Sequence, residues 1–167
     1  MSAGEIIAVL DAGPLIHLDE LGSLSLLSGY REVLLPDVVE SEAKKHRPQI
    51  QIDSISGLIR VSSQSATTES MFELAAEFGL HAGELAAIAA LKEHHGDCLL
   101  SDDAAARALA EAIGFQVRGT VGLILRSWQR KQISKAAACD LLKALPVRST
   151  LHLRPGFLEN VLEQISD

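Results

Sequence analysis

Three short apolar runs, each free of polar residues, constrain the fold of this 167-residue chain more than any other feature. They lie at residues 6–10, 33–35 and 98–100, and stretches with helical patterns separate them. A continuous apolar run is typical of a strand buried on both faces, as in a parallel sheet covered by helices. Weaker signals at 58–61 and 115–117 predict two further strands. The alternation predicts an α/β fold with a central, mainly parallel sheet.

Helical patterns fill the segments between these strands. Residues 83–94 are mostly alanine and leucine, the best helix formers, and give the clearest helix. One or two short helices are predicted over 15–27, with Pro14 placed to open the first. Further helices are predicted at 37–45, 71–78, 104–113, 120–128, 134–145 and 156–165, with a loop at 62–68. No internal repeat or long linker is present, so we expect one domain over residues 1–167.

The charge balance excludes one class of function. Lys and Arg number 15 against 22 Asp and Glu, which gives a formal net charge of -7. Domains that coat nucleic acid through general basicity usually have a pI above about 9, so this chain does not belong with them. An enzyme that cleaves nucleic acid is compatible with the balance, because net charge does not report local patches.

Several familiar site motifs are missing from the sequence. Cys98 and Cys139 lie far apart in apolar surroundings, which predicts two buried free thiols. The histidines show no zinc-ligand spacing, and neither a glycine-rich phosphate loop nor a Gly-x-Ser-x-Gly elbow occurs. The run at 6–10 is too short for a signal-peptide core or a membrane span, and no other stretch approaches about 18 uncharged apolar residues. We therefore expect a soluble cytoplasmic protein with no membrane partner.

Carboxylates follow or flank the predicted strands. Because the functional crevice of an open parallel sheet lies at the carboxyl ends of its strands, acids at these positions are expected to share one rim. Two segments place acids directly after strands, and two more place them early in the following helices. The residues concerned are Asp11, Glu40, Glu42, Glu84, Asp102 and Asp103.

Two interpretations of these carboxylates are open. Gathered carboxylates repel one another, and Mg²⁺ or Mn²⁺ relieves the repulsion through hard oxygen ligands. Such an ion activates water and stabilises charge on a phosphate during cleavage. The alternative is structural: a turn residue at Asp11, an N-cap at Asp102 or Asp103, a helix-dipole partner at Glu84, and solvated charges in the helix after residue 36.

Four blocks of the sequence resemble PIN-domain proteins and come in the order found in that family. The blocks are residues 7–16 (IAVLDAGPLI), 35–42 (LPDVVESE), 83–90 (GELAAIAA) and 99–107 (LLSDDAAAR), the last followed by Gly114 and residues 119–122 (GTVG). The doubled Asp followed by Ala and Arg is nearest to a prokaryotic branch similar to the VapC toxins. The resemblance covers about residues 5–130 and implies a PIN-like three-layer α/β/α sandwich, with residues 131–167 as a helical extension.

By this resemblance the activity is metal-dependent endonucleolytic cleavage, mostly of RNA, with Mg²⁺ or Mn²⁺ as cofactor. Asp11, Glu84 and Asp103 match the first, third and fourth acids of the family site. Glu42 matches the second acid best, and Glu40 is the alternative.

The same comparison gives supporting roles to three further residues. Asp102 is the extra acid of this branch and is expected to share the metal site. Ser101 is expected to support that site through a water or a carboxylate. Arg107 lies about one helical turn beyond Asp103, and we expect it to guide the RNA strand.

The resemblance also implies partners. The substrate is expected to be RNA, and a toxin of this kind would have an antitoxin protein that blocks the acidic edge. Homodimers are frequent in this fold, so a homodimer is a further expected assembly. The alternative to a nuclease is a PIN-like binding or regulatory module with little or no nuclease activity.

Overall fold

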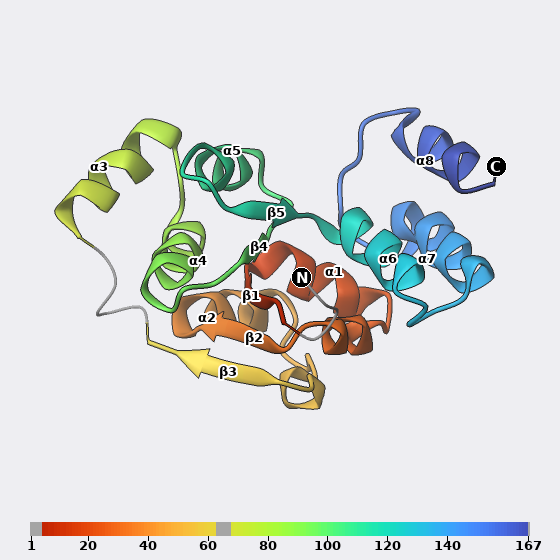
Figure 1. Ribbon diagram of the computed structural model, residues 1–167, viewed down its shortest axis with the longest axis horizontal. Coiled ribbons are helices and arrows are strands. Elements are labelled where there is room, and N and C mark those ends of the chain that lie inside the picture. Colours follow the sequence, from red (N-terminus) through yellow and green to blue (C-terminus); the bar gives the residue numbers. More distant parts are fainter. Residues whose placement is uncertain (1–4, 63–67, 167) are drawn as a thin grey trace.

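A five-stranded sheet lies at the centre of the computed structural model, which describes residues 5–62 and 68–166 (Figure 1). All four strand pairs are parallel, and the strand order is β3-β2-β1-β4-β5. Helices cover both faces of the sheet, which confirms the predicted three-layer α/β/α sandwich. The strands are β1 (Ile7–Leu10), β2 (Glu32–Pro36), β3 (Leu58–Val61), β4 (Cys98–Leu100) and β5 (Gln116–Arg118).

The central strands are apolar because both of their faces are covered. Val9 in β1, Leu35 in β2 and Leu99 in β4 are completely buried. At the edge of the sheet the pattern changes, because β3 exposes Ile59 and Arg60. The continuous apolar runs thus mark the inner strands, and the weaker signals mark the edge strands.

The helices also agree with the sequence prediction in number and approximate bounds. The alanine-rich α4 packs on β1, β2 and β4, whereas α6 packs on β5 and joins α1 and α7. The helices are α1 (Ala12–Glu20), α2 (Asp37–His46), α3 (Glu69–Phe78), α4 (Ala82–Glu93), α5 (Ala104–Ala112), α6 (Thr120–Gln129), α7 (Lys135–Arg148) and α8 (Phe157–Ser166), with 3-10 turns η1 (Leu24–Gly29) and η2 (Ile52–Ser54).

The structure differs from the sequence prediction in three details. Helix α7 continues through Pro146 to Arg148, because a proline keeps a helical φ and removes only one main-chain hydrogen bond near a helix end. Cys98 is buried as expected, but Cys139 is only partly buried, and both thiols are free. Pro14 lies in the first turn of α1, which already begins at Ala12. Most of the predicted loop at 62–68 lies outside the described residues.

The order of the strands creates one edge where a site can form. The chain builds β2 and β3 on one side of β1, and then β4 and β5 on the other side. Ligands of such sheets bind outside the carboxyl ends of the strands at the point where the order reverses, here between β1 and β4. Leu10 pairs with Leu100 in the register of these two strands, so Asp11 and Ser101 leave the sheet side by side. No helix in the described part of the chain is long and apolar enough to cross a bilayer.

Candidate active site

Asp11 lies at this edge, where it ends β1 and caps α1. Its Oδ1 accepts a hydrogen bond of 2.8 Å from the Ala12 amide, and its Oδ2 accepts one of 2.6 Å from the Ser101 hydroxyl. Burial raises the pKa of Asp11 to about 6, although both hydrogen bonds lower it. The charges of Glu84 and Glu42 raise the pKa further. Asp11 is therefore a buried carboxyl group under the influence of other acids.

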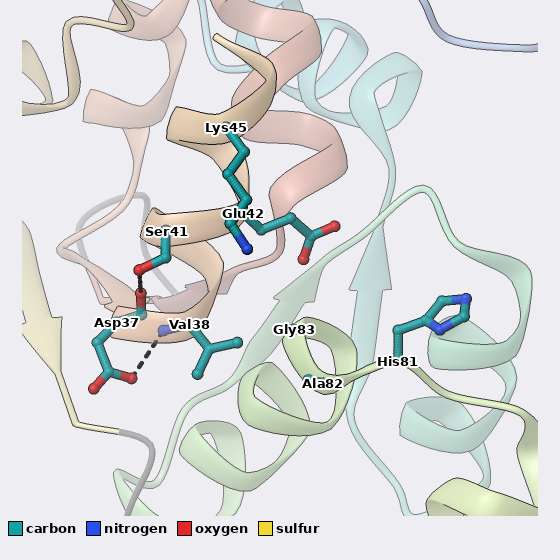
Figure 2. Close-up of a pocket in the computed structure, with 8 residues that line it drawn as sticks. All are labelled: Asp37, Val38, Ser41, Glu42, Lys45, His81, Ala82 and Gly83. Carbon is teal, nitrogen blue, oxygen red and sulfur yellow. Dashed lines mark hydrogen bonds between the residues drawn. The ribbon is translucent and has the colours of Figure 1, made fainter. Parts of the chain in front are cut away.

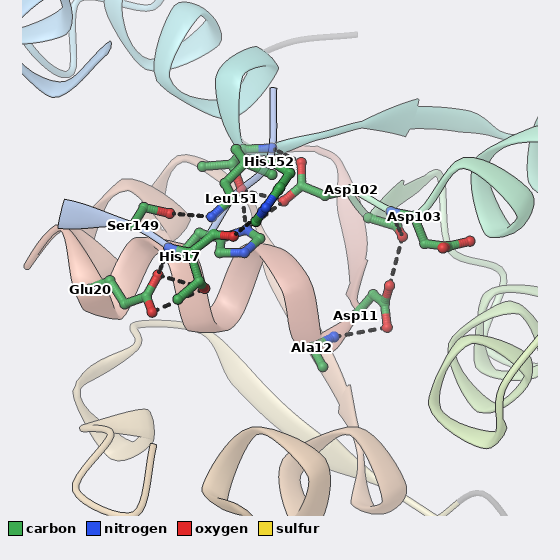
Figure 3. Close-up of polar contacts among 12 residues, drawn as sticks. Asp11, Ala12, His17, Glu20, Asp102, Asp103, Ser149, Leu151 and His152 are labelled. Carbon is green, nitrogen blue, oxygen red and sulfur yellow. Dashed lines mark hydrogen bonds and ion pairs between the residues drawn. The ribbon is translucent and has the colours of Figure 1, made fainter. Parts of the chain in front are cut away.

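Ser101 joins Asp11 to the acid that follows β4. Its buried hydroxyl donates to Asp11 and accepts a hydrogen bond of 3.2 Å from the Asp103 amide. Asp103 in turn caps α5, because its Oδ1 accepts a hydrogen bond of 2.8 Å from the Ala106 amide. Figure 3 shows Asp11 and Asp103 at the ends of neighbouring strands. Ser101 therefore connects Asp11 to the start of α5 through its hydroxyl group.

Glu84 enters the site from the first turn of α4. Its Oε2 accepts a hydrogen bond of 2.6 Å from the His81 amide, which is half of a capping box. Burial raises the pKa of Glu84, the hydrogen bond from His81 lowers it, and the charges of Asp103 and Glu42 raise it further. Glu84 therefore combines a capping contact with a place among the other acids.

Glu42 approaches from α2 and lies over the start of α4. Gly83 makes this possible, since a Cβ added there would collide with the Glu42 carboxylate. Glu42 lines a cavity of about 450 Å³ between the two helices, together with Lys45 and His81 (Figure 2). The cavity therefore brings a carboxylate and a lysine side chain to the same opening.

Asp11, Glu42, Glu84 and Asp103 form what we call the acidic cluster. Their charges influence one another: Glu42 and Glu84 raise the pKa of Asp11, and Glu42 and Asp103 raise the pKa of Glu84. In the conformation described for residues 5–62 and 68–166, no three His, Cys, Asp or Glu side chains converge closely enough to hold a metal ion. The donor set nevertheless fits a hard divalent cation, because it consists of carboxylates whose mutual repulsion a cation relieves. Some rearrangement of the side chains would be needed to close the cluster on an ion.

Glu40 lies outside the acidic cluster. Its carboxylate pairs with Arg60 of β3 at 2.8 Å and with Lys44 at 2.6 Å. The hydrogen bond from Arg60 lowers the pKa of Glu40 most, and Lys44 lowers it further. Residues two apart on a helix point in different directions, so only one of Glu40 and Glu42 can face α4. Of the two alternatives, the structure brings Glu42 to the other acids.

Asp102 takes part in a separate set of hydrogen bonds. Its Oδ1 accepts a hydrogen bond of 2.8 Å from the Thr120 amide. Its Oδ2 accepts hydrogen bonds of 2.6 Å from the Thr120 hydroxyl and 2.9 Å from His17 (Figure 3). Burial raises the pKa of Asp102, but these hydrogen bonds outweigh it and leave the pKa below its ordinary value. Asp102 therefore fastens α1 to α6, and within the described residues none of its hydrogen bonds goes to a side chain of the acidic cluster.

His17 and Thr120 are the partners that sequence reasoning missed. The available signals were weak: a lone histidine in an apolar helix and a threonine at the start of another. Nearby, Arg107 lines a cavity of about 400 Å³ with Asp102 and His152. The segment that carries His152 is held on α1, where Glu20 accepts a hydrogen bond of 2.8 Å from the Thr150 amide. Arg107 thus faces this second cavity beside the acidic cluster.

A family model for the PIN domain matches residues 7–167. The chain belongs to the PIN-domain family. The match also includes residues 131–167, which the resemblance over about residues 5–130 did not cover. A search of curated proteins gave no match to this PIN domain. PIN domains are generally nucleases and typically use divalent metals. Membership of the family therefore indicates a nuclease-type hydrolase whose substrate is a nucleic acid.

Proposed function

We propose that this PIN-domain protein is an endoribonuclease that depends on Mg²⁺ or Mn²⁺. The observation that carries the proposal is the acidic cluster, in which four elements contribute carboxylates to the carboxyl edge of a parallel sheet. Asp11, Glu42, Glu84 and Asp103 would hold the ion. When bound, it supplies Lewis acidity and a water of lowered pKa.

The protein's own residues have separate tasks in this scheme. Ser101 orients Asp11 through its hydroxyl proton and fixes the start of α5 by accepting from the Asp103 amide. Asp11 has little freedom to move, because both of its oxygens accept hydrogen bonds. Lys45 lines the cavity beside Glu42 and is suited to contact a phosphate of the RNA. Arg107 would contact the strand on the other side of Asp103.

The finer biological role is also a proposal. The doubled Asp in residues 99–107 supports a toxin of the VapC type, acting in the cytoplasm as one domain over residues 1–167. Such a toxin would be inhibited by an antitoxin protein and would be able to form a homodimer. A small gene next to this one, whose product co-purifies with the protein and abolishes RNA cleavage, would support that role. A gene neighbourhood without such a product would favour a housekeeping nuclease.

The catalytic proposal is tested by RNA cleavage in the presence of Mn²⁺. Asp11→Asn and Asp103→Asn should each lower the rate by about 10²-fold or more, because each removes charge stabilisation at the reacting phosphate. Glu42→Gln should behave in the same way, and Glu40→Gln is its matched control on the same helix. Parent-level cleavage by the Asp11 and Asp103 variants would overturn the proposed roles.

Calorimetry with Mn²⁺ separates a nuclease from the alternative binding module. A nuclease of this kind should bind the ion in the micromolar-to-millimolar range, and Asp11→Asn should weaken the binding. If no heat of binding is detected across that range, a PIN-like module with little or no nuclease activity becomes the better description.

A further inference from the structure

Three buried polar side-chain atoms in the described part of the chain have no hydrogen-bond partner. They are Tyr30 Oη, Arg118 Nε and Arg126 Nη2. Their residues precede β2, end β5 and lie within α6, and none of them belongs to the acidic cluster. Buried polar groups in native proteins are nearly always hydrogen-bonded, so each of these exceptions calls for an explanation such as a bound ion or water.

Tyr30 and Arg126 are in direct contact. The Arg126 guanidinium lies over the Tyr30 ring, with its Cζ 4.4 Å from the ring centroid. Its Nη1 donates a hydrogen bond of 3.2 Å to the Gly29 carbonyl, whereas Nη2 has no acceptor. Both side chains are deeply buried, since each residue is only 4% exposed.

Arg118 reaches the same region from β5. It lies beside Gly122, and a Cβ added at that glycine would be 3.8 Å from the Arg118 Cβ. Gly122 is one helical turn before Arg126 on α6. Burial lowers the pKa of Arg126, and the positive charges of Arg130 and Arg118 lower it further. The guanidinium groups are therefore close enough to repel one another.

No carboxylate in residues 5–62 or 68–166 forms an ion pair with Arg118 or Arg126. The ion pairs within these two ranges join acids to other, mostly exposed cations, as in Glu40 with Arg60 and Asp19 with Arg47. Arg118 is only partly buried and its Nη2 donates a hydrogen bond of 3.2 Å to Gln116 Oε1. Arg126 is a buried cation without an opposite charge, which is unfavourable because desolvation is not compensated. A water molecule would satisfy the free donors but would leave the charge in place. An anion would satisfy the donors and the charge together.

We propose that Tyr30, Arg118 and Arg126 form a binding site for a small inorganic anion, with chloride as its ligand. The donors are O–H and N–H groups only, and arginine has no acceptor to offer a cation. Chloride accepts several hydrogen bonds without demanding a fixed geometry, which suits donors from three separate elements. The bound anion would join the start of β2, the end of β5 and α6. This site is independent of the proposed nuclease activity.

Thermal unfolding tests the site in solution. The protein is unfolded in sodium chloride and in sodium gluconate of equal ionic strength, because gluconate is too large for a buried site. Chloride at ten times its Kd should raise the Tm by about 3–6 °C relative to gluconate, and the rise should saturate. Tyr30→Phe and Arg118→Gln should each remove most of the rise. The exposed Arg154→Gln, which also removes one positive charge, should keep it.

Two results would overturn the proposal. One is an equal Tm in chloride and gluconate, and the other is a chloride effect of the same size in all three variants. Crystals grown in sodium bromide give a direct test, because bromide scatters anomalously. An anomalous peak within hydrogen-bond distance of Tyr30 Oη, Arg118 Nε and Arg126 Nη2 would support the site. A peak without anomalous signal, as expected for water, would refute it.

Discussion

Gly83→Ala should reduce RNA cleavage while leaving the fold at least as stable as before. The new Cβ would collide with Oε2 of Glu42 and would lie 3.6 Å from its Cδ and 3.9 Å from Val39 Cγ2. Only the carboxylate end is in conflict, so the flexible Glu42 side chain has to retreat by about 1 Å to reach van der Waals contact. The substitution thus moves one acid of the cluster without altering any charge.

The expected magnitudes follow from this geometry. Replacing a helical glycine by alanine stabilises a protein by about 0.5–1 kcal/mol, which corresponds to a Tm increase of about 1–4 °C for a chain of this size. Displacement of the Glu42 carboxylate by about 1 Å should lower kcat/KM for RNA cleavage by up to about 10²-fold. Stability and activity should therefore change in opposite directions.

The assay compares Mn²⁺-dependent RNA cleavage and Tm for Gly83→Ala, Glu42→Gln and Gly122→Ala. Gly122 is a suitable control, because it is also helical and its added Cβ meets only the Arg118 Cβ at 3.8 Å. The reasoning is refuted if Gly83→Ala cleaves RNA at the parent rate while Glu42→Gln does not. That result would show that Glu42 acts from a position other than the one over Gly83.

Three other predictions concern residues around the same edge. Burial raises the pKa of Asp11 from 3.8 to about 6, so the parent loses stability as pH rises through that range. The unfolding free energy of Asp11→Asn should therefore gain on that of the parent between about pH 4 and 7, towards about 3 kcal/mol less the hydrogen bonds lost, and its Tm should rise relative to the parent with it. Asp102→Asn should lower the unfolding free energy by about 1–3 kcal/mol, because it weakens the hydrogen bonds from His17 and Thr120. The folded variant should keep its metal-dependent cleavage of RNA. Loss of cleavage would instead indicate that Asp102 holds the metal directly. Ser101→Ala should lower stability by about 1–2 kcal/mol and also slow cleavage, and unchanged values of both would contradict its bridging role.

The fold was predictable because its main signal is local. A run such as residues 6–10 has no polar side chain that could face solvent, so burial on both faces follows from the sequence. The strand order then brings Asp11 and Ser101 together, and their proximity could be expected from the rule for parallel sheets. The helix that continues past Pro146 shows the limit of this reasoning, because the sequence marks a possible break but not its small local cost.

Side-chain direction was the part that the sequence could not provide. Asp102 and Asp103 are adjacent in the chain, but the first turns towards His17 and Thr120, and the second caps α5. The choice depends on donors at Thr120, 18 residues away, and at His17, 85 residues away in the chain, which no local pattern reports. The same is true of Glu40, whose partner Arg60 belongs to the edge strand β3.

The distribution of charge in the molecule bears on how an acidic protein could bind RNA. The excess of 22 acids over 15 cations is partly concentrated at one edge of the sheet, where Asp11 and Glu84 have raised pKa values. Such an edge repels a phosphate backbone unless a cation lies between them. Arg126 cannot compensate, because it is buried against Tyr30. On the proposed function, RNA affinity should therefore depend on the divalent ion itself, since the ion both relieves the repulsion among the carboxylates and offers the phosphate its nearest positive charge.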